Sequence, residues 1–102
     1  MYGPCPMGHW SNTAKRDGGG ARLALVVGNR YRVIQEFADY DHERHPVGET
    51  WTYLGTGGSA YHDGISWFVT LDGVSEWHIP MEYREGGQIE VLQALDEYIA
   101  LD

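Results

Sequence analysis

Apolar and polar residues alternate in short runs over most of the chain, and turn-forming residues separate these runs. In residues 29–37, for example, Tyr31 and Val33 alternate with Arg30 and Arg32. A period of two is typical of a strand with one buried face. An apolar run at 23–28 precedes this stretch, and strand-like runs follow at 49–55, 65–71 and 74–80. The pattern therefore predicts a mainly β domain of about five short strands.

The last two runs predict a hairpin whose register follows from their apolar residues. A two-residue loop at Asp72-Gly73 would place Trp67 opposite His78. A three-residue loop, 71–73, pairs Trp67 with Trp77 instead. It also pairs Ile65 with Ile79 and Val69 with Ser75, and it leaves Ser66, Phe68, Thr70, Glu76 and His78 on an exposed face. Because a slip of one residue swaps the faces of a strand, the three-residue loop is the predicted register.

The two ends of the chain differ from this β pattern. Residues 1–22 contain Pro4, Pro6 and the glycine run 18–20 and have no sustained periodicity, which predicts a flexible N-terminal tail. In residues 87–102, the spacing of Ile89, Leu92, Leu95 and Ile99 predicts a C-terminal helix. That helix would cover an open end of the β domain. Any apolar surface left over on the helix would allow a dimer. Residues 23–102 are expected to form a single domain.

Charge narrows the class of partner. The chain has 15 acidic and 7 basic residues and a net charge of −8. Residues 23–102 hold fourteen of the acids against four arginines. Such a surface repels nucleic acid and anionic membranes and is compatible with a basic protein partner. Cys5 is the single cysteine, so no internal disulfide is expected. No apolar run approaches the roughly 20 residues of a membrane span, and no signal peptide is recognised, so cytoplasmic residence is expected.

Residues 37–83 resemble the small barrels of the SH3-like class. The matching parts occur in the family's order: FADYD, VGETWTYL, SWFVTL and IPMEY. The resemblance implies a small SH3-like barrel with core positions at Trp67, Val69 and Ile79. It implies only half of a peptide groove, Tyr40, Pro80 and Tyr83, because Ser66, Ala38 and Glu82 stand where the family has groove residues. The segment RYRVIQEF…HPVGETWTYLG is also similar to a small bacterial family of unknown function.

The stretch DYDHERHPVGE, residues 39–49, is the strongest candidate for chemistry. It does not fit a calcium-binding EF-hand loop, which needs Gly and Glu where Arg44 and Thr50 stand. His42 and His45 have a spacing that can share a metal on a helix, but Pro46 follows and the stretch has no helical periodicity. We therefore expect a polar loop in which aspartates close local turns, with no metal or cofactor. Its residues would add an acidic rim to the groove, giving as binding residues Asp39, Tyr40, Asp41, Glu43, Pro80 and Tyr83.

Catalysis has less support in the sequence. Cys5 lies in the predicted tail and no serine lies in a nucleophile elbow. Ser66, His78 and Glu76 would lie near one another in the predicted register, without a donor for an oxyanion. The sequence is therefore interpreted as an acidic protein-interaction module rather than an enzyme. One alternative is an inhibitor or immunity protein that neutralises a basic target, and another is a small metal-dependent or Ser-His hydrolase.

Overall fold

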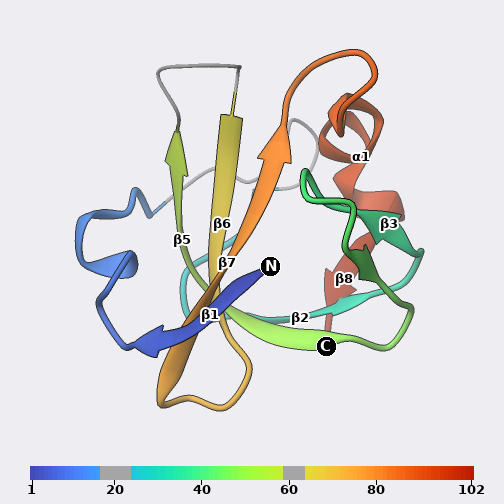
Figure 1. Cartoon of the computed structure of the whole chain (residues 1–102). Coiled ribbons are helices and arrows are strands. Elements are labelled where there is room, and N and C mark those ends of the chain that lie inside the picture. The colour runs from blue at the N-terminus through green and yellow to red at the C-terminus, as the bar shows by residue number, and fades with distance from the viewer. Residues whose placement is uncertain (17–23, 59–63) are drawn as a thin grey trace.

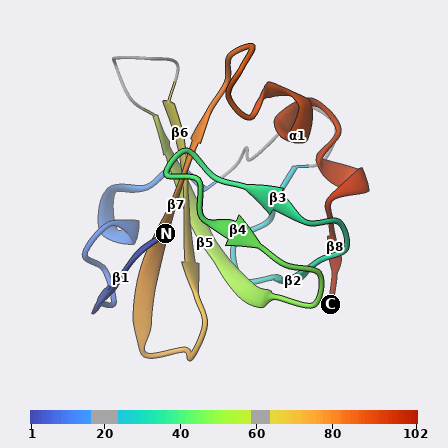
Figure 2. The same cartoon turned by 45° about the vertical axis from the view of Figure 1, so that its right-hand side comes forward.

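The computed structural model describes residues 1–16, 24–58 and 64–102 and shows a small, mainly β protein (Figure 1). Its strands are β1 (Tyr2–Pro6), β2 (Arg30–Val33), β3 (Phe37–Ala38), β4 (Arg44–His45), β5 (Thr50–Gly58), β6 (Gly64–Thr70), β7 (Ser75–Glu82) and β8 (Ile99–Leu101). Six of them form one antiparallel sheet in the order β1-β7-β6-β5-β2-β8, and β3 and β4 form a separate hairpin. Figure 2 shows this hairpin in front of the larger sheet.

The mainly β prediction is confirmed, whereas the closed SH3-like barrel is not. The six-stranded sheet is open, with β1 and β8 as its edges in the described parts of the chain. The apolar run at 23–28 forms no strand over residues 24–28, although Leu25 is buried in the core. The described residues also contain more strands than the five expected, because both ends of the chain join the sheet and β3 and β4 form a separate hairpin.

The β6–β7 hairpin has the predicted faces but a different register. Trp67 pairs with Ile79 and Val69 with Trp77, two residues away from the predicted pairing. A shift of two keeps every side chain on its face, so Trp67, Val69 and Ile79 are core residues as predicted. The connection is longer than expected because the Asp72 carboxylate accepts the N–H groups of Val74 and Ser75, at 2.9 and 2.8 Å. This side chain stabilises a wider loop than the Asp-Gly pair alone predicts.

Aromatic side chains make up much of the core. Trp51, Tyr53 and Trp67 are fully buried in a core cluster that also contains Leu92 and Leu95 of the C-terminal segment, and Tyr31 and Phe37 are also buried. The Trp51 and Trp67 rings lie 6.1 Å apart. Rings of this size bury large apolar areas, which allows a chain this short to form a stable core.

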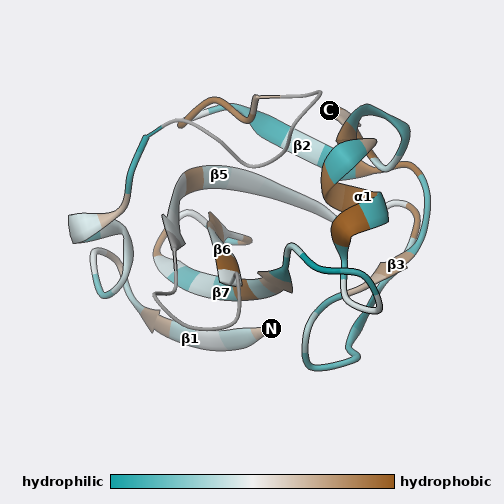
Figure 3. Ribbon diagram, turned by 90° about the horizontal axis from the view of Figure 1, so that it is seen from above, coloured by the Kyte–Doolittle hydropathy of each residue, from teal (hydrophilic) through white to brown (hydrophobic). Residues whose placement is uncertain are grey.

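The N-terminal residues are docked on the sheet, so the predicted tail is wrong for residues 1–16. β1 pairs with β7, with Tyr2 opposite His78 and Cys5 opposite Glu76. Figure 3 shows β1 along the outer side of β7. The remaining tail residues, 17–22, lie outside the described part of the chain. The segment covers the face of β6 and β7 that we expected to be exposed, where Phe68 and Glu76 are buried.

Glu76 explains why this segment docks despite its poor apolar pattern. Its carboxylate is fully buried and accepts N–H groups from Gly8 (2.9 Å), Trp10 and Ser11 (2.9 Å), and the Ser11 hydroxyl at 2.6 Å. Burial opposes ionisation, but the Ser11 hydroxyl and the three N–H donors outweigh it and lower the pKa of Glu76. A buried carboxylate therefore organises residues 8–11, including the start of the 3₁₀ helix Ser11–Thr13.

The C-terminal segment is not the long helix that the apolar spacing predicts. It consists of α1 (Ile89–Gln93), a 3₁₀ helix (Leu95–Glu97) and β8. Ala94 leaves the helical conformation, with φ −127° and ψ 41°, and Ile99 then pairs with Val33 of β2. Tertiary pairing at the sheet edge overrides helical spacing here. Val91, Leu92, Leu95 and Ile99 are buried in the chain's own core.

Candidate functional site

The polar stretch 39–49 forms the tip and second strand of the β3–β4 hairpin and runs into β5. Phe37 pairs with His45, and the Asp39 N–H donates to the carbonyl of Glu43 at 3.0 Å. The turn includes His42 at φ 64°, a left-handed conformation that non-glycine residues rarely adopt. The stretch that we expected to be a polar loop is therefore partly a strand, and Asp39 and His45 within it are buried.

Asp39 closes the turn in the way we expected of an aspartate. Its Oδ1 accepts the N–H groups of Asp41 and Glu43, at 2.9 and 3.2 Å. Its Oδ2 faces the other way, 2.9 Å from His45 Nε2 and 3.1 Å from the Met1 ammonium. Asp39 is fully buried, so it cannot form part of an exposed acidic rim. That part of the predicted binding surface is corrected.

His45 is held between two carboxylates. Its Nδ1 lies 2.6 Å from Glu49 Oε2, its Nε2 contacts Asp39, and its ring stacks on Phe37 with centroids 4.9 Å apart. Burial lowers the pKa of His45, but hydrogen bonds to Glu49 and Asp39 outweigh this and raise the pKa above its ordinary value. His45 and Asp39 stabilise each other's charged forms: burial raises the pKa of Asp39, and His45 and the Met1 ammonium lower it on balance.

The other residues predicted to bind lie on the surface. Tyr40 is 49% exposed, and its N–H donates to the carbonyl of Pro80 at 2.8 Å. Asp41 and Glu43 are exposed at the hairpin tip. Tyr83 is partly exposed, and its hydroxyl accepts a hydrogen bond from Gln93 at 3.1 Å. The structure thus brings Tyr40 beside Pro80 and places Tyr83 on the neighbouring loop.

Two adjoining hollows lie between this hairpin and the loop that connects β7 to α1. Their volumes are about 250 and 310 Å³, and both are lined by His42, Gly86, Gly87 and Gln88. We call them together the hairpin–loop groove. The remaining lining residues are Tyr40 and Glu82 in the first hollow and Glu36, Phe37, Ala38, Glu90, Val91 and Tyr98 in the second.

The loop side of the hairpin–loop groove is held in place by Glu82 and Gln88. The Glu82 N–H donates to Gln88 Oε1 at 2.8 Å, and the Gln88 N–H donates to the Glu82 carbonyl at 2.9 Å. A Cβ on Gly87 would lie 3.0 Å from that carbonyl, so the close approach needs a glycine. Sequence reasoning missed this loop, and the Gly86-Gly87 pair was the signal that could have indicated it.

The predicted Ser-His-Glu set is only partly formed. His78 Nε2 lies 2.5 Å from Ser66 Oγ, although the two residues are not directly paired across the strands. Burial lowers the pKa of His78, and the N-terminal ammonium lowers it further. Glu76 is not a third member, because its carboxylate is engaged by residues 8–11.

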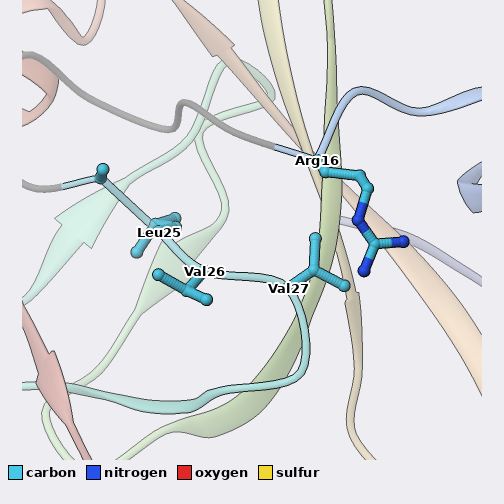
Figure 4. A pocket seen from close by; sticks show the side chains of 5 residues that line it. Arg16, Leu25, Val26 and Val27 are labelled. Atoms are coloured by element: carbon cyan, nitrogen blue, oxygen red, sulfur yellow. The ribbon is translucent and has the colours of Figure 1, made fainter.

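A separate hollow is lined by Arg16, Ala24, Leu25, Val26 and Val27. Figure 4 shows the aliphatic part of the Arg16 side chain near Val27, with Leu25 farther along the segment. Its lining residues flank positions 17–23 in the sequence, which lie outside the described residues. We assign this hollow no function.

Comparison with known proteins supports the fold. No family model and no curated protein matches the sequence. An integron cassette protein from the mobile metagenome of Vibrio cholerae has a similar solved structure, with 27% sequence identity and a TM-score of 0.79. The match covers 90% of this chain and 97% of that one. In the described parts of the chain, no helix is long and apolar enough to cross a membrane. The chain is therefore similar, over nearly its whole length, to a protein carried on a mobile bacterial gene cassette.

Proposed function

We propose that the protein is a non-catalytic binding module that recognises a basic segment of a partner protein in the hairpin–loop groove. The observation that carries this proposal is the acidic lining of the groove. Glu36, Glu82 and Glu90 line the two hollows, and no Lys or Arg side chain belongs to the described lining. A concave surface with one sign of charge concentrates ligands of the opposite sign.

Residues around the groove add to its acidic character. Asp41 and Glu43 lie on the exposed hairpin tip, and Tyr40 offers a half-exposed ring at the groove itself. Exposed tyrosines with apolar and polar parts are common anchors in protein interfaces.

Two arginines near the groove are already paired. Arg44 donates to Glu36 at 2.8 Å, and Arg84 lies 3.8 Å from Glu82. All four side chains except Glu82 are substantially exposed. Exposed pairs of this kind are worth only about 0–1 kcal/mol, so an incoming basic segment can compete for both glutamates. An inhibitor that neutralises a basic target would use the same surface.

A peptide of alternating lysine and tyrosine residues provides a direct test. We expect its addition to isotope-labelled protein to shift the backbone amide signals of Tyr40, His42 and Gly86–Gln88, with shifts that decrease as salt rises. Replacing both Glu82 and Glu90 by Gln should abolish the shifts. The matched control Glu97→Gln removes an exposed charge outside the groove and should leave them unchanged. The proposal would be contradicted if amide signals near all acidic surface residues shifted equally. It would also be contradicted if the shifts persisted in the double variant.

A further inference from the structure

Three side chains of the β3–β4 hairpin present ligand atoms to one another on the side where Asp39 Oδ2 points. Asp39, Glu43 and His45 each offer one such atom, and all of these atoms lie within 4.8 Å of one another. One imidazole nitrogen and two carboxylate oxygens are ligand types that zinc and related divalent metals bind. Asp39 and His45 are buried while Glu43 is exposed, so the cluster is rigid on one side and open to solvent on the other.

The surroundings of the cluster orient these atoms independently of their mutual contacts. Glu49, which is not a member of the cluster, accepts the Nδ1 side of His45 at 2.6 Å and leaves Nε2 facing Asp39. Metal-binding histidines commonly donate their second ring nitrogen to a carboxylate in this way, which fixes the ring and increases its basicity. The backbone N–H groups of Asp41 and Glu43 likewise engage Asp39 Oδ1 and leave Oδ2 free to face the cluster.

A cation already occupies the space between the carboxylates. The Met1 ammonium lies 3.1 Å from Asp39 Oδ2 and 3.2 Å from Glu43 Oε2. Asp39 and Glu43 thus already hold one positive charge between them, and a divalent ion at the same place would contact the same two carboxylates.

We propose that Asp39, Glu43 and His45 form a binding site for a divalent transition metal, with Glu49 as the carboxylate that orients His45. When the ion binds, it forms a bond with His45 Nε2, and any proton on that nitrogen passes to the buffer. The ion takes the place of the Met1 ammonium between the two carboxylates, and solvent completes its coordination. The site links the hairpin tip to β4 and stands apart from the proposed function of the hairpin–loop groove.

Calorimetric titration of tag-free protein with zinc chloride at neutral pH tests this site. We expect one ion per chain. Uptake of several ions per chain, as adsorption on surface carboxylates would give, or no uptake at all, would overturn the proposal.

Variants on and near the hairpin locate the ion. Glu43→Gln, at an exposed position, should remove tight binding without unfolding the protein, which circular dichroism would verify. Glu49→Gln should weaken binding by about 10- to 100-fold, as expected for a group that orients a ligand. The matched control His42→Ala alters an exposed histidine outside the cluster and should bind zinc normally. Loss of binding in His42→Ala with retention in Glu43→Gln would show that the ion binds elsewhere.

Discussion

At the scale of single residues, Glu76 shows how a charge can replace apolar contacts as an organising centre. It is a buried carboxylate on the β6–β7 face that the N-terminal segment covers, and it accepts the hydrogen bonds of residues 8–11 described above. Hydrogen bonds to a charged group contribute more than neutral ones and leave a larger penalty when one partner is removed. Sequence inspection assigned Glu76 to an exposed polar face, because the alternation of β7 cannot show what covers that face.

The Glu76→Gln substitution should reduce the free energy of unfolding by about 1.5–3 kcal/mol at neutral pH. Because folding lowers the pKa of Glu76, its ionised form stabilises the protein above the unfolded value of about 4.3. That contribution is lost as the pH falls through the folded value. Denaturant unfolding should therefore show a difference in the free energy of unfolding between the two proteins that is constant from pH 7 down to about pH 4.3. Between there and about pH 3 the difference should become smaller.

The exposed Glu97→Gln substitution serves as the control for Glu76→Gln. It should stay within about 0.5 kcal/mol of the original protein at every pH. The contrary results are a Glu76→Gln change in the free energy of unfolding that is only slight at neutral pH, or one that grows as the pH falls. Either result would show that the carboxylate is not held ionised by residues 8–11.

At the scale of elements, β5 depends on a close approach of the chain near Lys15. Lys15 and Thr56 exchange two backbone hydrogen bonds of 2.8 Å, and Gly55 beside them has φ +144°. A Cβ on Gly55 would lie 2.8 Å from the Ala14 Cβ and 2.9 Å from the Lys15 carbonyl oxygen. Gly55→Ala should therefore destabilise the protein by more than the roughly 1–3 kcal/mol that backbone strain alone costs.

The Gly48→Ala variant separates the backbone strain from the steric contact that both act in Gly55→Ala. Gly48 also has a positive φ, +98°, but a Cβ there would meet nothing within 4 Å. It should show the strain without the steric contact. Thermal unfolding of both variants makes the comparison, and an equal or smaller loss at Gly55 would mean that residues 14–15 do not pack against β5.

The strands and helices also differ in how far the sequence predicts them. Alternation identified β2, β5, β6 and β7 and the buried positions Tyr31, Trp67 and Ile79, because one face of each strand is buried. It could not show that residues 99–101 pair with β2, since the apolar spacing from 89 to 99 fits a helix equally well. Nor could it fix the β6–β7 register, which depends on the side chain of Asp72.

At the scale of the whole molecule, the two candidate sites differ in how the fold assembles them. The hairpin–loop groove joins residues 36–42 to the distant residues 82–91, whereas the proposed metal site brings Asp39, Glu43 and His45 together within one hairpin. The composition of the 39–49 stretch made it the candidate site, and the order of its residues does not fit a calcium loop. Which histidine is buried, and which aspartate, follows only from the hairpin geometry.

Removal of residues 2–13 tests whether the N-terminal segment belongs to the same cooperative unit as the rest of the domain. The deletion leaves β7 as a sheet edge and uncovers Phe68, whose burial alone contributes about 1.5–3 kcal/mol. A loss of 1 kcal/mol lowers the melting temperature of a domain this size by about 4–8 °C, so we expect a fall of at least about 6 °C.

The deletion should also cancel the effect of Glu76→Gln, because the donors on residues 8–11 are then absent. Substitutions that act through one contact are not additive. Calorimetry of the four combinations measures the coupling between them. Equal costs of Glu76→Gln in the full and shortened chains, or unchanged melting after the deletion, would show that the N-terminal segment does not stabilise the fold through Glu76. The expected result is a Glu76→Gln cost that is present in the full chain and close to zero without residues 2–13.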